Sequence, residues 1–136
     1  MRLTPDVLTF LGDRPDVPRL MSGLDVLVWL SRGEGMPHVI AEAGAARLAV
    51  VATPDNGVRQ QLRHAQSGLF VPYDDPAAAA DAVDLLLRRP LLREQLGTAL
   101  RRTVEREYST TVAIEAWKQV LAEVTAPDQR RPRAAG

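Results

Sequence analysis

One stretch of the chain decides the fold, and it reads Val26-Leu27-Val28-Trp29-Leu30-Ser31-Arg32-Gly33-Glu34-Gly35-Met36-Pro37-His38-Val39-Ile40-Ala41-Glu42-Ala43. Its first five residues favour a strand, because they are apolar and mostly branched or aromatic. A small polar loop follows, and a helical pattern begins at Pro37, since proline is well tolerated in the first turn of a helix. A strand that leads through a short loop into a helix is half of a βαβ unit. The stretch therefore predicts an α/β protein with a parallel sheet and flanking helices.

The same alternation continues on both sides of this stretch. Apolar runs predict strands at residues 7–11, 25–30, 49–52 and 67–72. Besides the helix that begins at Pro37, helical spacing predicts helices at residues 17–24, 58–63, 77–88, 91–107 and 109–124. The run at 25–30 is nearly continuous, so this strand is expected to be buried on both faces. Together the elements predict a Rossmann-like sheet with right-handed crossovers.

Local residues set several of the expected boundaries. Asp75 followed by Pro76 has the order of an N-cap and a first helical residue. Residues 53–57 have turn chemistry, in which the Asn-Gly pair can take positive φ. In the last helix, Trp117 and Val120 belong to an apolar stripe that is expected to pack mostly in a core, with part of the helix left exposed.

Length and composition place the chain among globular proteins of one domain. We expect a domain over residues 1–124 and a disordered tail over residues 125–136, which has no apolar periodicity. Seventeen basic and seventeen acidic residues cancel, which argues against a nucleic-acid-binding protein. The chain has no cysteine, which excludes disulfides and thiolate metal sites. No apolar run approaches the ~20 residues of a transmembrane segment and no signal-peptide pattern is present, so a cytoplasmic location is expected.

The loop after the strand at 25–30 is the candidate ligand site, because ligands of parallel α/β sheets bind outside the carboxyl ends of the strands. The free N–H groups of Gly35, Met36 and His38 are expected to point outward at the helix start. Together with the helix dipole they favour an anion such as a diphosphate. Gly33 and Gly35 allow the backbone to approach a ligand closely.

Two glutamates flank this anion site. Glu42 lies five residues after Pro37, roughly 7.5 Å further along the helix axis, and it shares a face of the helix with His38. Its carboxylate can accept hydrogen bonds from vicinal hydroxyls such as those of a ribose, and Glu34 can accept from hydroxyls on the other side of the diphosphate. This arrangement favours a nucleotide sugar. Taken alone, two glutamates at this spacing also occur by chance as solvated surface residues.

At these residues the chain closely resembles the retaining GT-B glycosyltransferases of family 4, also called the glycosyl transferases group 1 family. The patterns Ser-x-x-Glu-Gly-Met-Pro and Glu-x7-Glu carry the resemblance, and they match Ser31, Glu34, Gly35, Met36, Pro37 and Glu42. Further blocks agree in their order, namely Phe10-Leu11-Gly12, Asp16-Val17-Pro18, Asp25-Val26-Leu27-Val28, Val50-Val51-Ala52-Thr53, Ser67-Gly68-Leu69-Phe70-Val71-Pro72, Asp75-Pro76 and Leu85-Leu86-Leu87. The match covers about residues 7–124.

The resemblance implies a fold and a role for each matching position. The implied fold is the C-terminal, nucleotide-sugar-binding domain of a GT-B protein, truncated at its N-terminal side. The implied contacts are, for the donor sugar, Glu34, Gly35, Met36 and Pro37, for the ribose Glu42 and, near the diphosphate, Ser31, Gly33 and His38. No metal or other cofactor is implied, because the nucleotide-diphosphate sugar is a substrate. No complete catalytic set is expected on this chain.

The implied activity is that of a hexosyltransferase, which moves a sugar from a nucleotide-diphosphate sugar to an acceptor with retention of configuration. By this resemblance, the acceptor-binding N-terminal domain of the family and the basic residues that neutralise the diphosphate are expected to lie outside this chain. We therefore expect the isolated chain to be inactive without that domain or a partner chain that supplies it. The alternative is a non-catalytic partner chain or remnant that binds a sugar nucleotide. Peripheral association with a membrane through the missing half stays open.

Other chemistries fit these residues less well. Where the family has Gly-Gly-x-x-Glu, this chain has Asn56-Gly57-Val58-Arg59-Gln60. The contacts of that loop are therefore open, and Arg59 either contacts phosphate or is an exposed residue at a helix start. His38 and His64 are too few for a metal site without cysteine. A glycosidase pair of Glu34 and Glu42 is disfavoured because a nearby helix N-terminus keeps carboxylates ionised. An epimerase of the same fold fits the Glu-Gly-Met-Pro run less well than a transferase does.

Overall fold

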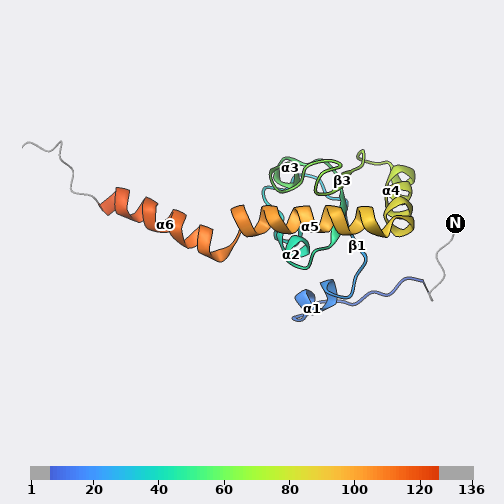
Figure 1. The fold of residues 1–136 in the computed structure, drawn as a ribbon, viewed down its shortest axis with the longest axis horizontal. Coiled ribbons are helices and arrows are strands. Elements are labelled where there is room, and N and C mark those ends of the chain that lie inside the picture. The colour runs from blue at the N-terminus through green and yellow to red at the C-terminus, as the bar shows by residue number, and fades with distance from the viewer. Residues whose placement is uncertain (1–6, 126–136) are drawn as a thin grey trace, which may run out of the picture.

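A parallel sheet forms the centre of the protein in a computed structural model that describes residues 7–125 (Figure 1). Within these residues the sheet has three strands in the order β1-β2-β3. They are β1 (Val26–Trp29), β2 (Ala49–Ala52) and β3 (Leu69–Phe70). All neighbouring strands run parallel, which confirms the predicted α/β class with a parallel sheet and flanking helices.

The central strand separates two apolar cores. All four residues of β2 are buried, and successive side chains point to opposite faces. Val50 and Ala52 belong to a core with residues of α2 (His38–Ala45), α3 (Asn56–Gln61) and the second half of α5 (Pro90–Glu107). Ala49 and Val51 belong to the core on the other face, with α4 (Pro76–Arg88) and the first half of α5. Helices on both faces explain why β2 is apolar throughout.

At the N-terminal side one predicted strand is absent, and the predicted burial of another is wrong. Residues 7–11 form no strand, and the side chain of Phe10 is 89% exposed. An extended segment is a strand only when a neighbour completes its ladder of hydrogen bonds, and the sheet in residues 7–125 offers this segment no partner. The prediction that the strand at 25–30 is buried on both faces also fails, because β1 lies at the edge of the sheet and Val28 is 42% exposed.

The fourth predicted strand is shorter than expected. Of residues 67–72, only Leu69 and Phe70 form β3. The preceding chain turns tightly, with Ser67 Oγ accepting a hydrogen bond from the N–H of Arg63 at 2.9 Å. Pro72 has no N–H for a ladder, so pairing ends before it.

The helices agree well with the local start signals. Asp75 caps α4 by accepting a hydrogen bond from the N–H of Ala78 at 2.9 Å, as expected from the Asp-Pro pair. The first helix, α1 (Val17–Met21), ends three residues before the predicted boundary. Asn56 and Gly57 open α3 and do not adopt positive φ, so the predicted turn at this pair is wrong.

The last helix, α6 (Thr110–Thr125), runs away from the body of the molecule beyond the end of α5 (Figure 1). None of its residues is buried, and Trp117 is 66% exposed. Its apolar stripe is therefore not part of a core in residues 7–125, contrary to the prediction. Thr125, predicted to open a tail, is the last residue of α6, and the rest of that predicted tail lies outside the described residues.

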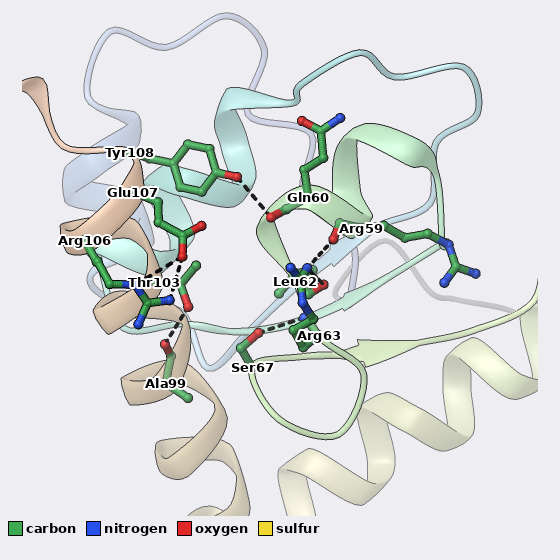
Figure 2. Close-up of polar contacts among 10 residues, drawn as sticks. All are labelled: Arg59, Gln60, Leu62, Arg63, Ser67, Ala99, Thr103, Arg106, Glu107 and Tyr108. Atoms are coloured by element: carbon green, nitrogen blue, oxygen red, sulfur yellow. Dashed lines mark hydrogen bonds and ion pairs between the residues drawn. The ribbon is translucent and has the colours of Figure 1, made fainter. Parts of the chain in front are cut away.

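A hydrogen bond joins the end of α5 to α3 just before α6 begins (Figure 2). The hydroxyl of Tyr108 donates a hydrogen bond to the carbonyl of Gln60 at 3.0 Å. Tyr108 also packs against the core that contains α2 and α3. The position of α5 is thus set by apolar packing along its length and by this contact at its end. Among the helices of residues 7–125, none is both long and apolar enough to cross a membrane.

We predict that Gly97→Ala destabilises the fold. A Cβ at Gly97 would overlap the carbonyl oxygen of Arg47, where α5 crosses the turn between α2 and β2. Forcing an atom into such a contact should lower the free energy of unfolding by about 1–3 kcal/mol, although alanine favours helix. Urea denaturation measures the change. Gly23→Ala is the control, since the nearest atom to its Cβ would be the Leu20 carbonyl oxygen at 3.6 Å. Equal stability of the two variants would contradict the prediction.

Candidate functional site

The candidate site is the loop that joins β1 to α2 at the carboxyl edge of the sheet. The strand ends at Trp29, and α2 begins at His38 with Pro37 as its N-cap residue, one position later than predicted. Within residues 7–125, no hydrogen bond uses the N–H groups of Gly35, Met36 or His38. These donors and the positive end of the α2 dipole are available to an anion, as the sequence predicted.

The two glutamates lie on either side of this helix start. Glu34 is half-buried in the loop, and Glu42 is exposed on α2, as is His38 one turn earlier. Glu42 borders an apolar hollow of about 340 Å³ between α1 and α2. The other residues of this hollow are Pro18, Ser22, Ala45 and Ala46. The arrangement offers two carboxylate acceptors flanking free backbone donors.

The connection between β2 and α3 makes hydrogen bonds to the β1–α2 loop. Thr53 Oγ1 donates a hydrogen bond to the carbonyl of Ser31 at 2.6 Å. The N–H of Gly57 donates to the carbonyl of Glu34 at 3.2 Å. A Cβ at Gly57 would overlap the carbonyl group of Gly35. This glycine is therefore required by the close approach of two backbone segments, and its flexibility is not the reason for its place.

Asp55 is the buried acceptor of this connection. It is 9% exposed, and its Oδ2 accepts a hydrogen bond from the N–H of Gly33 at 2.5 Å. That hydrogen bond lowers the pKa of Asp55 most; burial raises it, and the N–H groups of Glu34 and Asn56 lower it further. The carboxylate is thus ionised at neutral pH and can bind several donors at once.

A cleft of about 260 Å³ lies beside the loop, at the carboxyl ends of the strands. Its lining residues are Leu30, Ser31, Arg32, Thr53, Pro72, Tyr73, Asp74, Asp75 and Pro76. The guanidinium of Arg32 lies 4.7 Å from the centroid of the Tyr73 ring and pairs with Asp74 at 2.7 Å. The hydroxyl of Tyr73 lies 3.4 Å from Asp55 Oδ2, as a donor. Burial raises the pKa of Tyr73, and the neighbouring Asp55 carboxylate raises it further.

The eight residues that the sequence assigned to the site are nearly consecutive in the chain; of these, Ser31 lines the cleft and Glu42 the apolar hollow. Those on the loop and helix start are Ser31, Gly33, Glu34, Gly35, Met36, Pro37 and His38, and Glu42 follows on α2. Arg59 is directed elsewhere, because its Nε donates to the Pro54 carbonyl at 2.9 Å and its guanidinium lies 5.3 Å from the Phe70 ring centroid. In residues 7–125, no three acidic or histidine side chains gather to hold a metal ion. The roles in ligand binding stay predictions.

Sequence reasoning missed Arg32, Asp55 and Tyr73. Arg32 lies in the loop itself, two residues before Glu34. Asp55 and Tyr73 follow β2 and β3, whose carboxyl ends meet the loop at one edge of the sheet. The signal that could have found them is this rule of α/β sheets, applied to every strand and not to one.

Known proteins resemble the chain in sequence and in fold. The model of the family described as glycosyl transferases group 1 matches residues 2–103. The putative glycosyltransferase EpsD of Bacillus subtilis is 32% identical over 113 residues, which are 83% of this chain and 29% of that protein. The chain spans about a third of the length of the curated relatives it matches.

Solved structures agree on the fold. Anabaena HepE, crystallised with UDP and also with UDP-glucose, superposes with a TM-score of 0.83 at 19% identity, over 87% of this chain and 33% of that chain in the UDP complex. The C-terminal domain of the group 1 family protein LpcC from Francisella tularensis gives a TM-score of 0.67 at 25% identity, over 76% of this chain and 53% of that chain. With a family model that matches three quarters of its length and a fold shared with GT-B glycosyltransferases, this chain belongs to the glycosyl transferases group 1 family.

Proposed function

We propose that this chain is the donor-binding part of a retaining glycosyltransferase that uses a nucleotide-diphosphate sugar. The observation that carries the proposal is the placement of Glu34 and Glu42 on either side of free N–H donors at the start of α2. The complexes of HepE with UDP and UDP-glucose, a protein of the same fold, support a nucleoside diphosphate as the ligand.

Each part of the site has a separate task in this proposal. The N–H groups of Gly35, Met36 and His38 bind the diphosphate, aided by the α2 dipole. Glu42 accepts hydrogen bonds from the ribose, and the hollow beside it offers the base an apolar surface. Glu34 accepts hydrogen bonds from hydroxyls of the donor sugar and so orients its anomeric carbon. Ser31 and Gly33 shape the loop near the diphosphate.

The transfer step needs further groups. A diphosphate that leaves gains negative charge, and preorganised donors stabilise that charge in the transition state. The α2 start supplies part of this stabilisation. An acceptor held close to the anomeric carbon is also required. We propose that a second domain or a partner chain supplies the acceptor site and the remaining positive charge, since this chain spans about a third of its relatives. No metal has a role in the proposal.

The first prediction concerns binding. Calorimetric titration of the chain with UDP, GDP and ADP should show binding of at least one diphosphate. Glu42→Gln should lower the affinity for that diphosphate and for its glucose conjugate alike, roughly tenfold, because a neutral acceptor replaces a charged one. Glu34→Gln should lower the affinity for the glucose conjugate only. Glu94→Gln, an exposed change at the start of α5, is the control. If the wild-type chain binds no nucleoside diphosphate, the proposal is wrong.

The second prediction separates binding from turnover. The isolated chain should bind the donor but release no nucleoside diphosphate from it above the uncatalysed rate, which a coupled assay of released UDP measures. A chain that also contains the acceptor-binding domain should turn over. A sugar-nucleotide-binding protein without activity, the second candidate function, is favoured if the acceptor-binding half fails to restore turnover. Release of nucleoside diphosphate by the isolated chain, clearly above the uncatalysed rate, would contradict the proposal that the active site is divided.

A further inference from the structure

Asp55 belongs to the β2–α3 connection, but its side chain serves the β1–α2 loop. Its Oδ2 accepts the Gly33 N–H at 2.5 Å from a residue 22 positions away in the sequence. The side chain makes no capping hydrogen bond to the first turn of α3. That helix starts through the main chain, where the N–H of Arg59 donates to the Asp55 carbonyl at 2.8 Å. The short hydrogen bond of the carboxylate is therefore made to the loop, while the nearby N–H of Asn56 only adds to the lowering of its pKa.

The loop depends on contacts from this side. Gly33 has a φ of +83°, a backbone conformation that residues other than glycine rarely adopt. A Cβ at this position would have no other atom within 4 Å. Its outer side is thus open, and so is that of Gly35. Two glycines in a short loop leave the backbone much conformational freedom, which hydrogen bonds and close packing must restrict. For the residue just before Glu34, Asp55 supplies that bond.

Glu34 is held on both sides by the same connection. Asp55 fixes the preceding residue, Gly33, and the N–H of Gly57 binds the carbonyl of Glu34 itself at 3.2 Å. Tyr73 brings the third strand end to the same carboxylate, at 3.4 Å from Oδ2. Arg32, on the other side of Gly33, stacks over the Tyr73 ring. One buried carboxylate therefore links the ends of all three strands beneath the loop.

We propose that Asp55 is a positioning residue for Glu34: by binding the Gly33 N–H from below, it fixes the direction in which the Glu34 carboxylate meets the donor sugar. The part of this inference that concerns the sugar rests on the proposed function. The part that concerns the loop does not, because the contacts exist in the chain without a ligand. Asp55 touches no substrate in this proposal.

The test uses Asp55→Ala, Asp55→Asn and the control Asp84→Ala. Asp84 is exposed on α4 and, within residues 7–125, pairs only with Arg88, so its removal takes away the same charge outside the loop. Backbone NMR of the free chain reports the amides of Gly33 and Glu34. We expect both amides to shift and to exchange with solvent faster in Asp55→Ala. Asparagine keeps one acceptor oxygen, so Asp55→Asn should restore part of the protection, and Asp84→Ala should change neither amide.

Calorimetry with UDP and UDP-glucose then tests the link to the sugar. Asp55→Ala should lower the affinity for UDP-glucose roughly tenfold and the affinity for UDP clearly less. Only UDP-glucose carries the sugar hydroxyls from which Glu34 accepts hydrogen bonds in the proposal. A general loss of folding would lower both affinities together, and a thermal melt checks for it.

The two measurements have separate consequences. Unchanged Gly33 and Glu34 amides in Asp55→Ala would overturn the positioning of the loop. Equal weakening of UDP and UDP-glucose would overturn the role toward the sugar. If the wild-type chain binds neither ligand, nor GDP or ADP, it is the proposed function that fails, and the amide measurement alone decides what Asp55 does.

Discussion

The contact between Gly57 and the carbonyl of Gly35 is the constraint on which the site depends. It presses the start of α3 against the β1–α2 loop so closely that no side chain fits between them. This approach places the Gly57 N–H on the Glu34 carbonyl and brings Asp55 beneath Gly33. Without it, the loop with its two glycines would lose a main restraint on its path.

The sheet and the helices make this contact possible. Alternate residues of β2 pack into the two cores. On one side of β2, α2 and α5 pack closely at Gly44, where a Cβ would overlap the side chain of Val104. Because α2 is fixed in this way, its N-terminus points out at the carboxyl edge of the sheet. The glutamates then inherit their positions from the helix and the loop. A packed core on both faces is thus what orients a site that itself lies at the surface.

The family membership and the geometry support each other at different levels. The family model and the shared GT-B fold establish which kind of protein this is. The proposal is that the N–H donors and carboxylates around the start of α2 bind the nucleotide sugar. At the departure from Asn56 to Gln60, the Gln60 side chain is exposed, and only the main-chain carbonyl of this residue, which any amino acid would supply, accepts the Tyr108 hydroxyl.

Local sequence alone determined several elements of this protein. The Asp75-Pro76 pair predicted the start of α4, and the apolar run Ala49–Ala52 predicted β2, because capping and strand propensity act within a few residues. The loop and helix that carry Glu34 and Glu42 were predicted for the same reason.

Only the tertiary structure decided what surrounds these elements. Whether Val28, Phe10 and Trp117 are buried depends on neighbours that an apolar pattern cannot name, and in residues 7–125 those neighbours are missing. The roles of Asp55 and Gly57 likewise arise from contacts with residues 22 positions away, which no local pattern encodes. Propensity acts over a few residues, whereas burial and hydrogen-bond partners are set by the packing of distant segments.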